Sequence, residues 1–421
     1  MPELFPPLAL LTWLGVPLYA LRARGRPYAL FGFLLLCATL PGALVTHARL
    51  SGWVAADLRP WLDVAFAGAM AAAGLHLAHL VRARLRGTAF RLAVSVPGQA
   101  FLAAGLLAGA WQLALLPARG ALAALDAGAA LQALRPLDLV PLLVAALSIV
   151  TSAGRRLEWV RVRVGGDGPA ELRRVPVERH RRRAPRPLAR RPLRLVQIAD
   201  PHLGPWQPVA RLKSSLERLL ACDPDLVLLT GDFLTMESHG SPGALARALA
   251  PLARAPGRCF AVFGNHDHEA REEVRAALRT NGVRLLLDEE AVAETAFGPI
   301  QLLGADYVRR GRRRHLEGLV ARFPRRPGHG RILLLHDPSA FAHLAPGEID
   351  LALSGHTHGG QLGLLSLGLD WTVLSRSRWP DHGLFARGAS RLYVHRGTGF
   401  YGFPLRVGVP GELSVLEVAW D

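Results

Sequence analysis

The chain has 421 residues and a formal net charge of +17. It is too long for one ordinary domain, and its three cysteines, which show no CxxC spacing, argue against a disulfide framework or a cysteine-built zinc site. Between Leu4 and about Gly154, charged residues are confined to the gaps between long stretches of Leu, Ala, Val and Phe. The sequence therefore predicts a membrane part, residues 1–154, followed by a soluble part.

The membrane part contains five stretches that reach, or nearly reach, the roughly 17–25 mostly apolar residues of a spanning helix. They are Leu4–Leu21, Tyr28–Val45, Trp61–Val81, Leu92–Leu116 and Leu137–Gly154. Arg22, Arg24 and Arg26 follow the first stretch where a signal peptide would have small residues for cleavage, so we expect a retained span. We predict an all-α transmembrane domain of about five helices.

Arginines concentrate in alternate loops of this domain. The loops after the first and third stretches hold Arg22, Arg24, Arg26, Arg82, Arg84, Arg86 and Arg91. Because positive loops stay in the cytoplasm, five spans of an inner or plasma membrane put the soluble part on the cytoplasmic side. A sixth span at Ala121–Leu134 would invert this prediction, but Asp126, Gln132 and the short length of that segment favour an interfacial helix.

Two histidines of the third stretch, His76 and His79, lie three residues apart and so share a helix face. Such a pair could ligate a haem or a metal. No matching pair occurs on another stretch, so we favour contacts with the membrane interface or with a neighbouring helix.

The segment after the membrane part is strongly basic. Between Arg155 and Arg194, fourteen arginines face four acids, which accounts for ten of the seventeen net charges. This position is typical of the cytoplasmic face of a membrane. A nucleic-acid partner is not expected, because neither interleaved aromatic residues nor a binding motif accompanies the arginines. Within residues 155–192 we predict a lead-in strand, Val160–Val164, and an exposed tether, Arg179–Pro192.

Residues 193–421 show the alternating pattern of an α/β domain. Short apolar runs of buried-strand length are Leu193–Ala199, Leu226–Thr230, Cys259–Phe263, Ile332–Leu335 and Leu351–Ser354. Helical spacing separates them at Pro208–Ala221, Ala244–Arg254 and Glu269–Thr280. Each apolar run ends in polar residues, which therefore fall on the loops where α/β sheets place their sites.

The five strand ends carry short motifs with the chemistry of metal ligands. They read Asp200-Pro201-His202, Gly231-Asp232, Gly264-Asn265-His266-Asp267, His336 and Gly355-His356-Thr357-His358. Carboxylate, amide oxygen and imidazole suit a hard-to-borderline divalent metal. A lone DxH or GD arises often by chance, and a single histidine at a strand end is more often structural. Five motifs in order, each directly after an apolar run, predict a metal site.

These motifs resemble the signature DxH, GD, GNH[DE], His and GHxH of the calcineurin-like metallophosphoesterases. The resemblance spans about Arg194 to Val418, and Pro201 stands where Leu or Thr is also common. Gly359-Gly360-Gln361 and the tail from Tyr393 to Gly399 look like the bacterial, often membrane-associated branch, which includes UDP-diacylglucosamine pyrophosphatases. The resemblance implies a sandwich of mixed β-sheets flanked by helices over residues 193–421.

By position, the resemblance also implies the ligands of two divalent ions. The first ion would be held by Asp200, His202 and His358, the second by Asn265, His336 and His356, and Asp232 would bridge them. We expect manganese, with iron, zinc or nickel as alternatives. A metal-bridging hydroxide would then attack phosphorus. His266, which is not assigned to a metal, would donate a proton to the leaving group, and Asp267 would orient it.

The expected function is hydrolysis of a phosphomonoester, phosphodiester or pyrophosphate, carried on a lipid or on a small molecule such as a nucleotide. Membrane lipids are the other expected partners. A second basic cluster, Arg309–Arg314, either binds an anionic group at the rim of the site or is a solvated surface run. Two alternatives are a membrane sensor or scaffold that uses the domain as a binding module, and a haem protein resting on His76 and His79.

Overall fold

The computed structural model describes residues 3–181, 184–186 and 191–420. The chain divides into two compact units, one of residues 1–151 with 402–405 and one of residues 152–401 with 406–421. Each unit is described by itself.

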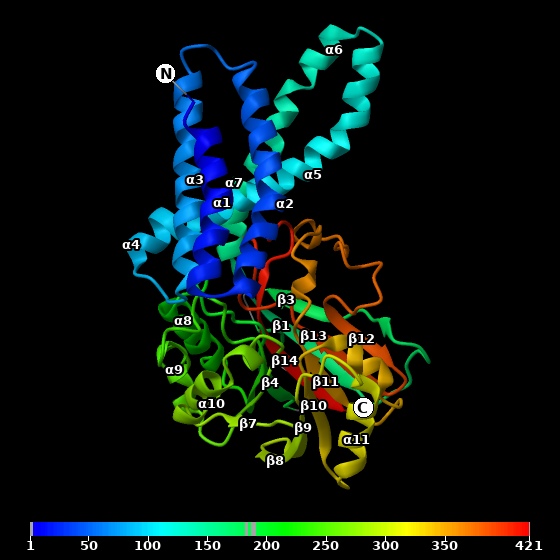
Figure 1. The fold of residues 1–421 in the computed structure, drawn as a ribbon. Coiled ribbons are helices and arrows are strands. Elements are labelled where there is room, and N and C mark those ends of the chain that lie inside the picture. Colours follow the sequence, from blue (N-terminus) through cyan, green and yellow to red (C-terminus); the bar gives the residue numbers. More distant parts are fainter. Residues whose placement is uncertain (1–2, 182–183, 187–190, 421) are drawn as a thin grey trace. The chain divides into compact units, whose positions relative to one another are not determined.

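The first unit is helical and is coloured blue to cyan in Figure 1. Its elements are α1 (Phe5–Ala23), α2 (Arg26–Ser51), α3 (Arg59–Val81), α4 (Thr88–Phe90), η1 (Arg91–Ser95), α5 (Val96–Ala124), α6 (Gly128–Ala133), η2 (Arg135–Leu139) and α7 (Val140–Ala153). Helices α2 and α5 approach closely, because a Cβ on Gly42 would lie 2.1 Å from the carbonyl oxygen of Gly105 and 2.3 Å from the nitrogen of Gly109. Gly105 and Gly109 form the small-xxx-small pattern of packed membrane helices.

The predicted spans form helices with shifted boundaries. Among the described residues, four helical stretches are long and apolar enough to cross a membrane: Arg26–Ser51, Arg59–Val81, Thr88–Ala124 and Gly128–Ala153. The first predicted stretch forms α1, which has 19 residues and is not among these four. The segment Ala121–Leu134 does not form one separate helix, because α5 continues to Ala124 and a short turn then leads into α6; its position at the membrane interface stays a prediction.

Polar groups inside the helical unit contact one another. The carboxylate of Asp63 accepts hydrogen bonds from the backbone N–H groups of Leu4 and Phe5 and so caps the start of α1. His76 Nε2 lies 2.9 Å from Gln99 Nε2, and the ring of His79 packs edge-on against Phe90 with centroids 4.8 Å apart. These contacts join neighbouring helical elements.

The second unit contains two sheets in its described part, which are coloured green to red in Figure 1. The first has the order β3-β1-β14-β4-β5-β6-β7 and the second the order β2-β12-β13-β11-β10-β9-β8. The strands are β1 (Arg155–Val164), β2 (Arg173–Arg174), β3 (Glu178–Arg181), β4 (Leu193–Ile198), β5 (Leu226–Thr230), β6 (Cys259–Val262), β7 (Arg284–Leu285), β8 (Glu289–Thr295), β9 (Gly298–Ala305), β10 (Gly330–Leu335), β11 (Leu351–Ser354), β12 (Gly383–Arg387), β13 (Ser390–Val394) and β14 (Gly411–Trp420). The five apolar runs of the sequence thus form β4, β5, β6, β10 and β11.

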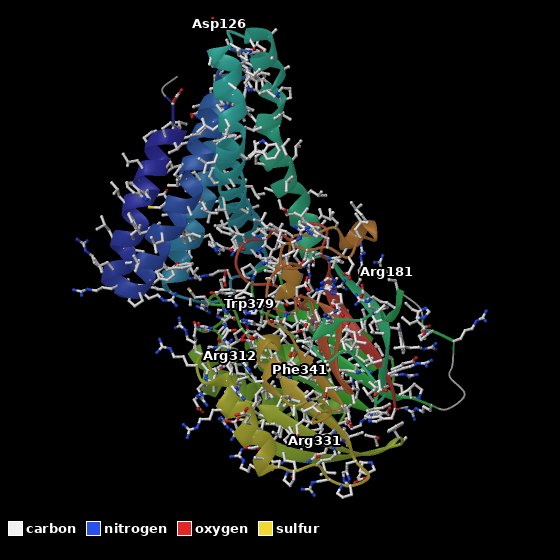
Figure 2. All side chains as sticks on the ribbon, turned by 90° about the vertical axis from the view of Figure 1, so that its right-hand side faces the viewer. Asp126, Arg181, Arg312, Arg331, Phe341 and Trp379 are labelled. Atoms are coloured by element: carbon white, nitrogen blue, oxygen red, sulfur yellow. The ribbon has the colours of Figure 1, made fainter. Side chains whose placement is uncertain are left out.

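One buried cluster joins the two sheets. It unites Leu195 and Leu228 of the first sheet with Leu334 and Leu353 of the second, so the sheets pack face to face. A second cluster packs α11 (Arg312–Arg322) and η5 (Pro338–His343) on the second sheet, and the buried Phe341, labelled in Figure 2, belongs to it. Helices α8 (Val209–Leu220), α9 (Ala244–Leu249) and α10 (Arg271–Thr280) accompany the first sheet (Figure 1). The predicted sandwich of mixed sheets flanked by helices is confirmed.

The basic segment contributes more to these sheets than the sequence indicates. The expected lead-in strand is longer, and β1 pairs in parallel with β14, with Val160 opposite Leu416. The expected tether begins as β3, which pairs antiparallel with β1. Alternation of Arg with the buried Val160, Val162 and Val164 explains why so basic a stretch forms a strand.

Candidate metal centre

Two groups of metal-ligating side chains meet in the described part of the second unit. Asp200, His202 and His358 form one group, and Asp232, His336 and His356 form the other; within each, the ligand atoms lie within 4.8 Å of one another. Asp200, His202 and Asp232 follow β4 and β5 of the first sheet, whereas the three other histidines follow β10 and β11 of the second. The centre therefore spans the carboxyl ends of strands from both sheets.

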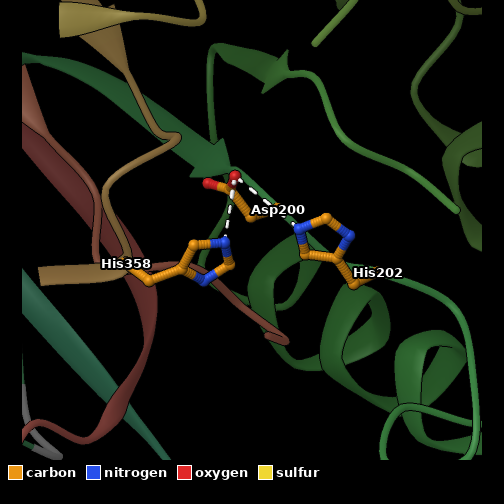
Figure 3. A group of neighbouring side chains, drawn as sticks. All are labelled: Asp200, His202 and His358. Atoms are coloured by element: carbon orange, nitrogen blue, oxygen red, sulfur yellow. Dashed lines mark ion pairs between the residues drawn. The ribbon is translucent and has the colours of Figure 1, made fainter. Parts of the chain in front are cut away.

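The first group surrounds a buried carboxylate (Figure 3). Asp200 Oδ1 lies 3.5 Å from His358 Nε2 and 4.0 Å from His202 Nε2. His202 Nδ1 lies 3.3 Å from the carbonyl oxygen of Leu234, so its N–H donates outward and Nε2 faces the centre. That Nε2 is buried and has no hydrogen-bond partner. A metal ion would satisfy it.

The asparagine that was expected to be a ligand, Asn265, lies beside the second group. His336 Nε2 lies 3.2 Å from Asn265 Oδ1 and 3.2 Å from His356 Nδ1. His336 Nδ1 donates to the carbonyl oxygen of Thr230 at 2.7 Å, which again leaves Nε2 toward the centre. The structure thus brings all seven predicted ligands together.

Asp232 lies between the two groups. Its Oδ2 is 3.3 Å from His336 Nε2 and 3.6 Å from His202 Nε2, and so contacts one imidazole of each group. Burial disfavours the charged carboxylate, but the neighbouring histidines, His336 above all, hold the pKa of Asp232 well below its usual range. One anionic side chain is therefore available to both ion positions.

Burial sets the protonation of the other ligands. It raises the pKa of Asp200 to about 7 and lowers the pKa of His202 and of His356 to about 4. Burial also opposes a charge on His336, but the carboxylates of Asp232 and Asp200 raise the pKa of His336 to about 10. The centre thus combines neutral imidazoles at His202 and His356 with a protonated imidazole at His336, whose proton a divalent ion would displace.

The backbone at these ligands is strained. Asp200, His202, Asp232, His356 and His358 all have φ between 43° and 71°, a region that non-glycine residues rarely occupy. Adjacent glycines leave room for the carboxylates. A Cβ on Gly264 would lie 2.1 Å from Asp232 Oδ1, and one on Gly355 would lie 2.2 Å from Asp200 Oδ2. These glycines are therefore required by close approach, not only by turn geometry.

The contacts of the two predicted catalytic residues correct one expectation. Asp267 was expected to orient His266, but its buried carboxylate accepts backbone N–H groups of Asp232 (2.7 Å), Phe233 (2.8 Å) and Gly264 (2.7 Å). It therefore fixes the turns that carry the ligands. His266 Nδ1 lies 3.3 Å from Oε1 of Glu269, which sequence reasoning missed.

The electrostatics of His266 agree with this pairing. Burial works against the charged imidazolium, but the hydrogen bond that His266 donates to Glu269 and the nearby Asp232 carboxylate raise the pKa of His266 above its usual value. A histidine with a raised pKa carries the proton that a leaving group needs. The signal in the sequence was the acidic residue three positions after His266, one helical turn away.

Two tyrosines at the centre were also missed, and one arginine of the predicted basic cluster lies beside it. The ring of Tyr401 lies 4.4 Å from that of His266 and 5.4 Å from that of His202, and Tyr307 lies 6.2 Å from His336. Of the basic cluster Arg309–Arg314, Arg312 (Figure 2) pairs at 2.9 Å with Asp337, directly after His336, whereas Arg313 pairs with Glu317 on the exposed side of α11. The cluster is therefore divided between the site and the surface.

Comparisons with known proteins agree on the second unit. A model of the calcineurin-like phosphoesterase family matches residues 193–360. Phosphodiesterase YaeI of Escherichia coli (strain K12) is 30% identical over 233 residues, which cover 54% of this chain and 82% of that protein. UDP-2,3-diacylglucosamine pyrophosphatase LpxG of Chlamydia trachomatis is 27% identical over 282 residues, covering 54% and 84%. A transmembrane protein with metallophosphoesterase domain from Danio rerio is 29% identical over 249 residues, covering 53% and 52%.

Proposed function

The chain belongs to the calcineurin-like metallophosphoesterases, which makes it a phosphoester hydrolase, and we propose that it uses two divalent ions held by the seven ligands described above. The observation that carries this proposal is the position of Asp232. Two cations a few ångströms apart repel each other, and a shared carboxylate offsets that repulsion. Asp232 Oδ2 lies within 3.6 Å of an imidazole nitrogen from each ligand group.

The donor set fits the metals that the family signature implies. Imidazole nitrogens with carboxylate and amide oxygens suit manganese, iron, zinc or nickel, and the set contains no thiolate. The buried, unpartnered Nε2 of His202 supports occupancy by a cation. When bound, two such ions supply a hydroxide-like nucleophile near neutral pH and offset the charge that develops on the phosphoryl oxygens. We propose manganese as the physiological metal.

The remaining steps belong to the side chains. His266 donates a proton to the leaving oxygen, and Glu269, at 3.3 Å, keeps His266 protonated and oriented. Asp267 holds the backbone of Asp232 and Gly264 through its two hydrogen bonds at 2.7 Å, so that the ligands and His266 keep a fixed geometry.

The substrate we propose is a phosphodiester or a pyrophosphate of a lipid-linked or nucleotide molecule. The names of two relatives, a phosphodiesterase and a UDP-2,3-diacylglucosamine pyrophosphatase, support this class. The alternative of a sensor or scaffold is disfavoured, because a binding module that had lost catalysis would be free to lose ligands, and all seven positions are filled.

Hydrolysis of bis(4-nitrophenyl) phosphate tests the proposed function. We expect the purified full-length protein to cleave this phosphodiester, to lose activity in a chelator and to regain it with added manganese, because the nucleophile depends on the metals. Release of nitrophenolate is the measurement. Activity that survives the chelator would contradict the metal mechanism, and failure with manganese, iron, zinc and nickel alike would favour the binding module.

We further propose that the second unit lies on the cytoplasmic side of the membrane. The heaviest arginine cluster follows the last apolar stretch, and positive segments are retained in the cytoplasm. An alkaline phosphatase fusion joined after Gly154 should therefore be inactive, and a green fluorescent protein fusion at the same position should fluoresce. The reverse pattern would place the unit outside and contradict the proposal.

A further inference from the structure

The exposed apolar side chains of the second unit are concentrated in one segment. Of the eight large apolar residues that are exposed in its described part, six lie between Leu364 and Trp379. They are Leu364, Leu367, Leu369, Trp371, Val373 and Trp379. Leu367 is 75% exposed and Trp371 45%. An apolar patch of this kind marks an interaction surface. We call residues 364–379 the apolar loop; Trp379 is labelled in Figure 2.

Hydrogen bonds hold the apolar loop in this outward conformation. The backbone of Leu364 donates to Trp371 at 2.9 Å, and that of Val373 donates to Leu362 at 3.0 Å, so the loop is closed at its base. Ser366 donates to the carbonyl oxygen of Gly408 at 2.9 Å. These three backbone N–H groups are thus hydrogen-bonded within the unit while the apolar side chains of the loop face outward. The exposure of these apolar side chains is therefore part of the hydrogen-bonded fold of the loop.

The composition of the apolar loop fits one kind of surface. Leucine and tryptophan side chains accompany the exposed Arg376 and Arg378, and the guanidinium of Arg378 lies 6.0 Å from the ring centre of Trp379. Tryptophan next to arginine is typical of the boundary between lipid headgroups and acyl chains. Cations beside the apolar side chains favour anionic headgroups.

The covalent connection of the second unit to an apolar helix also favours a bilayer as the occupant of this surface. The unit begins at Ser152, in the last turn of α7, and the stretch Gly128–Ala153 that contains α7 is long and apolar enough to cross a membrane. A short covalent connection keeps the unit at a high effective concentration near lipid. A partner protein would have to compete with the bilayer for this surface.

The apolar loop is joined directly to the metal centre. A Cβ on Gly360 would lie 2.9 Å from Val373 and 3.0 Å from Leu374, so the loop packs on the turn that carries two ligands. Thr357, which stands between the ligands His356 and His358, donates through Oγ1 to the carbonyl oxygen of Asp381 at 2.6 Å, just past the loop. A surface bound by the loop is therefore held near the metals.

We propose that the apolar loop inserts its leucine and tryptophan side chains into the headgroup region of an anionic phospholipid bilayer. This docking does not depend on the proposed hydrolysis. The consequence for the substrate rests on the proposed hydrolysis. A docked loop would present the metal centre to phosphate groups at the lipid surface, and the substrate class would then narrow to lipid-borne phosphodiesters and pyrophosphates.

Photocrosslinking of the full chain tests the docking. The photoreactive amino acid p-benzoyl-phenylalanine replaces Trp371, and the protein is placed in nanodiscs of phosphatidylethanolamine with tritiated phosphatidylglycerol. The matched control carries the same probe in place of Phe297, an apolar residue of the same unit that is 41% exposed and packs against Trp420. We expect tritium on the Trp371 position at a level several-fold above the control.

A second probe position and a charge-reversal variant extend this experiment. A probe in place of Leu367, the most exposed of the large apolar residues in the apolar loop, replaces the first one if the Trp371 variant fails to fold. Arg376→Glu with Arg378→Glu should lower the labelling of the Trp371 position by tritiated phosphatidylglycerol, because the two cations favour the anionic headgroup. A crosslink to protein in place of lipid, or equal labelling at Phe297, would overturn the proposal. The readout is a covalent crosslink and needs no turnover, so a failure of the docking and a failure of the proposed hydrolysis are distinguishable.

Discussion

Asp232→Asn should lower the occupancy of both metal sites at once. We expect the wild-type protein, purified without chelator, to hold about two divalent ions per chain and the variant to hold far fewer. The amide keeps the size of the carboxylate but not its charge, and Asp232 is the carboxylate placed between the two ligand groups. Substitution of residues that only hydrogen-bond to metal ligands already lowers metal affinity or activity about 10–100-fold. The loss of metal affinity in Asp232→Asn, which changes a ligand itself, should therefore exceed about 100-fold.

Elemental analysis of the purified protein measures this effect, with bis(4-nitrophenyl) phosphate turnover as the second readout. Asp223→Asn is the matched control, because Asp223 is an exposed loop aspartate with a similarly positive φ, 52° against 58° at Asp232. Asparagine tolerates this backbone region, so comparison of Asp232→Asn with Asp223→Asn separates the effect of the lost charge from any effect on the backbone conformation. An unchanged metal content in Asp232→Asn would eliminate the dinuclear centre.

His266→Ala should retain metal and lose about two to four orders of magnitude in turnover on substrates with poor leaving groups. An alkoxide or sugar leaving group depends on a proton donor, whereas a nitrophenolate of low pKa departs with little protonation. The loss should therefore be much smaller for a nitrophenyl ester. Metal content and turnover with an alkyl and a nitrophenyl ester are measured for the same preparation. His343→Ala, which removes an exposed histidine outside the centre, is the control.

A substitution of Glu269, the partner of His266, gives a second test of the proton-donor role. Glu269 raises the pKa of His266, so the protonated form of His266 persists to higher pH than it would alone. In Glu269→Gln that pKa falls, and the alkaline limb of the pH profile should move to lower pH, while metal content stays unchanged. Equal losses on both esters in His266→Ala would instead favour stabilisation of charge in the transition state. Loss of metal would show that His266 is structural.

The buried strands and their polar ends could be predicted from the sequence because both signals are local. An apolar run of four to seven residues followed by Asp, Asn or His predicts a strand and the group at its end, as at Ile198 and Asp200 or at Ser354 and His356. The pairing of β14 with β1 and β4 could not be predicted, because partners more than 200 residues apart leave no local pattern.

The orienting residue of His266 shows why site geometry needs the fold. Asp267 and Glu269 are both acidic neighbours of His266, and the sequence alone favours the adjacent one. Backbone N–H groups from the β5 loop decide otherwise, because Asp232 and Phe233 donate to the carboxylate of Asp267 and leave Glu269 for the imidazole. Tyr307 and Tyr401 were missed for a similar reason, since neither lies in a motif.

The distribution of the ligands over two sheets has a consequence for the biosynthesis of the protein. Asp200 and His358 are 158 residues apart (358 minus 200). At the usual pace of about 5–20 residues per second, a ribosome needs roughly 8–32 s to travel from the first ligand to the last. During that interval the emerging chain has carboxylates and imidazoles but no closed coordination sphere. Selection among competing metal ions must therefore be made by the completed domain after translation, when the second sheet has joined the first.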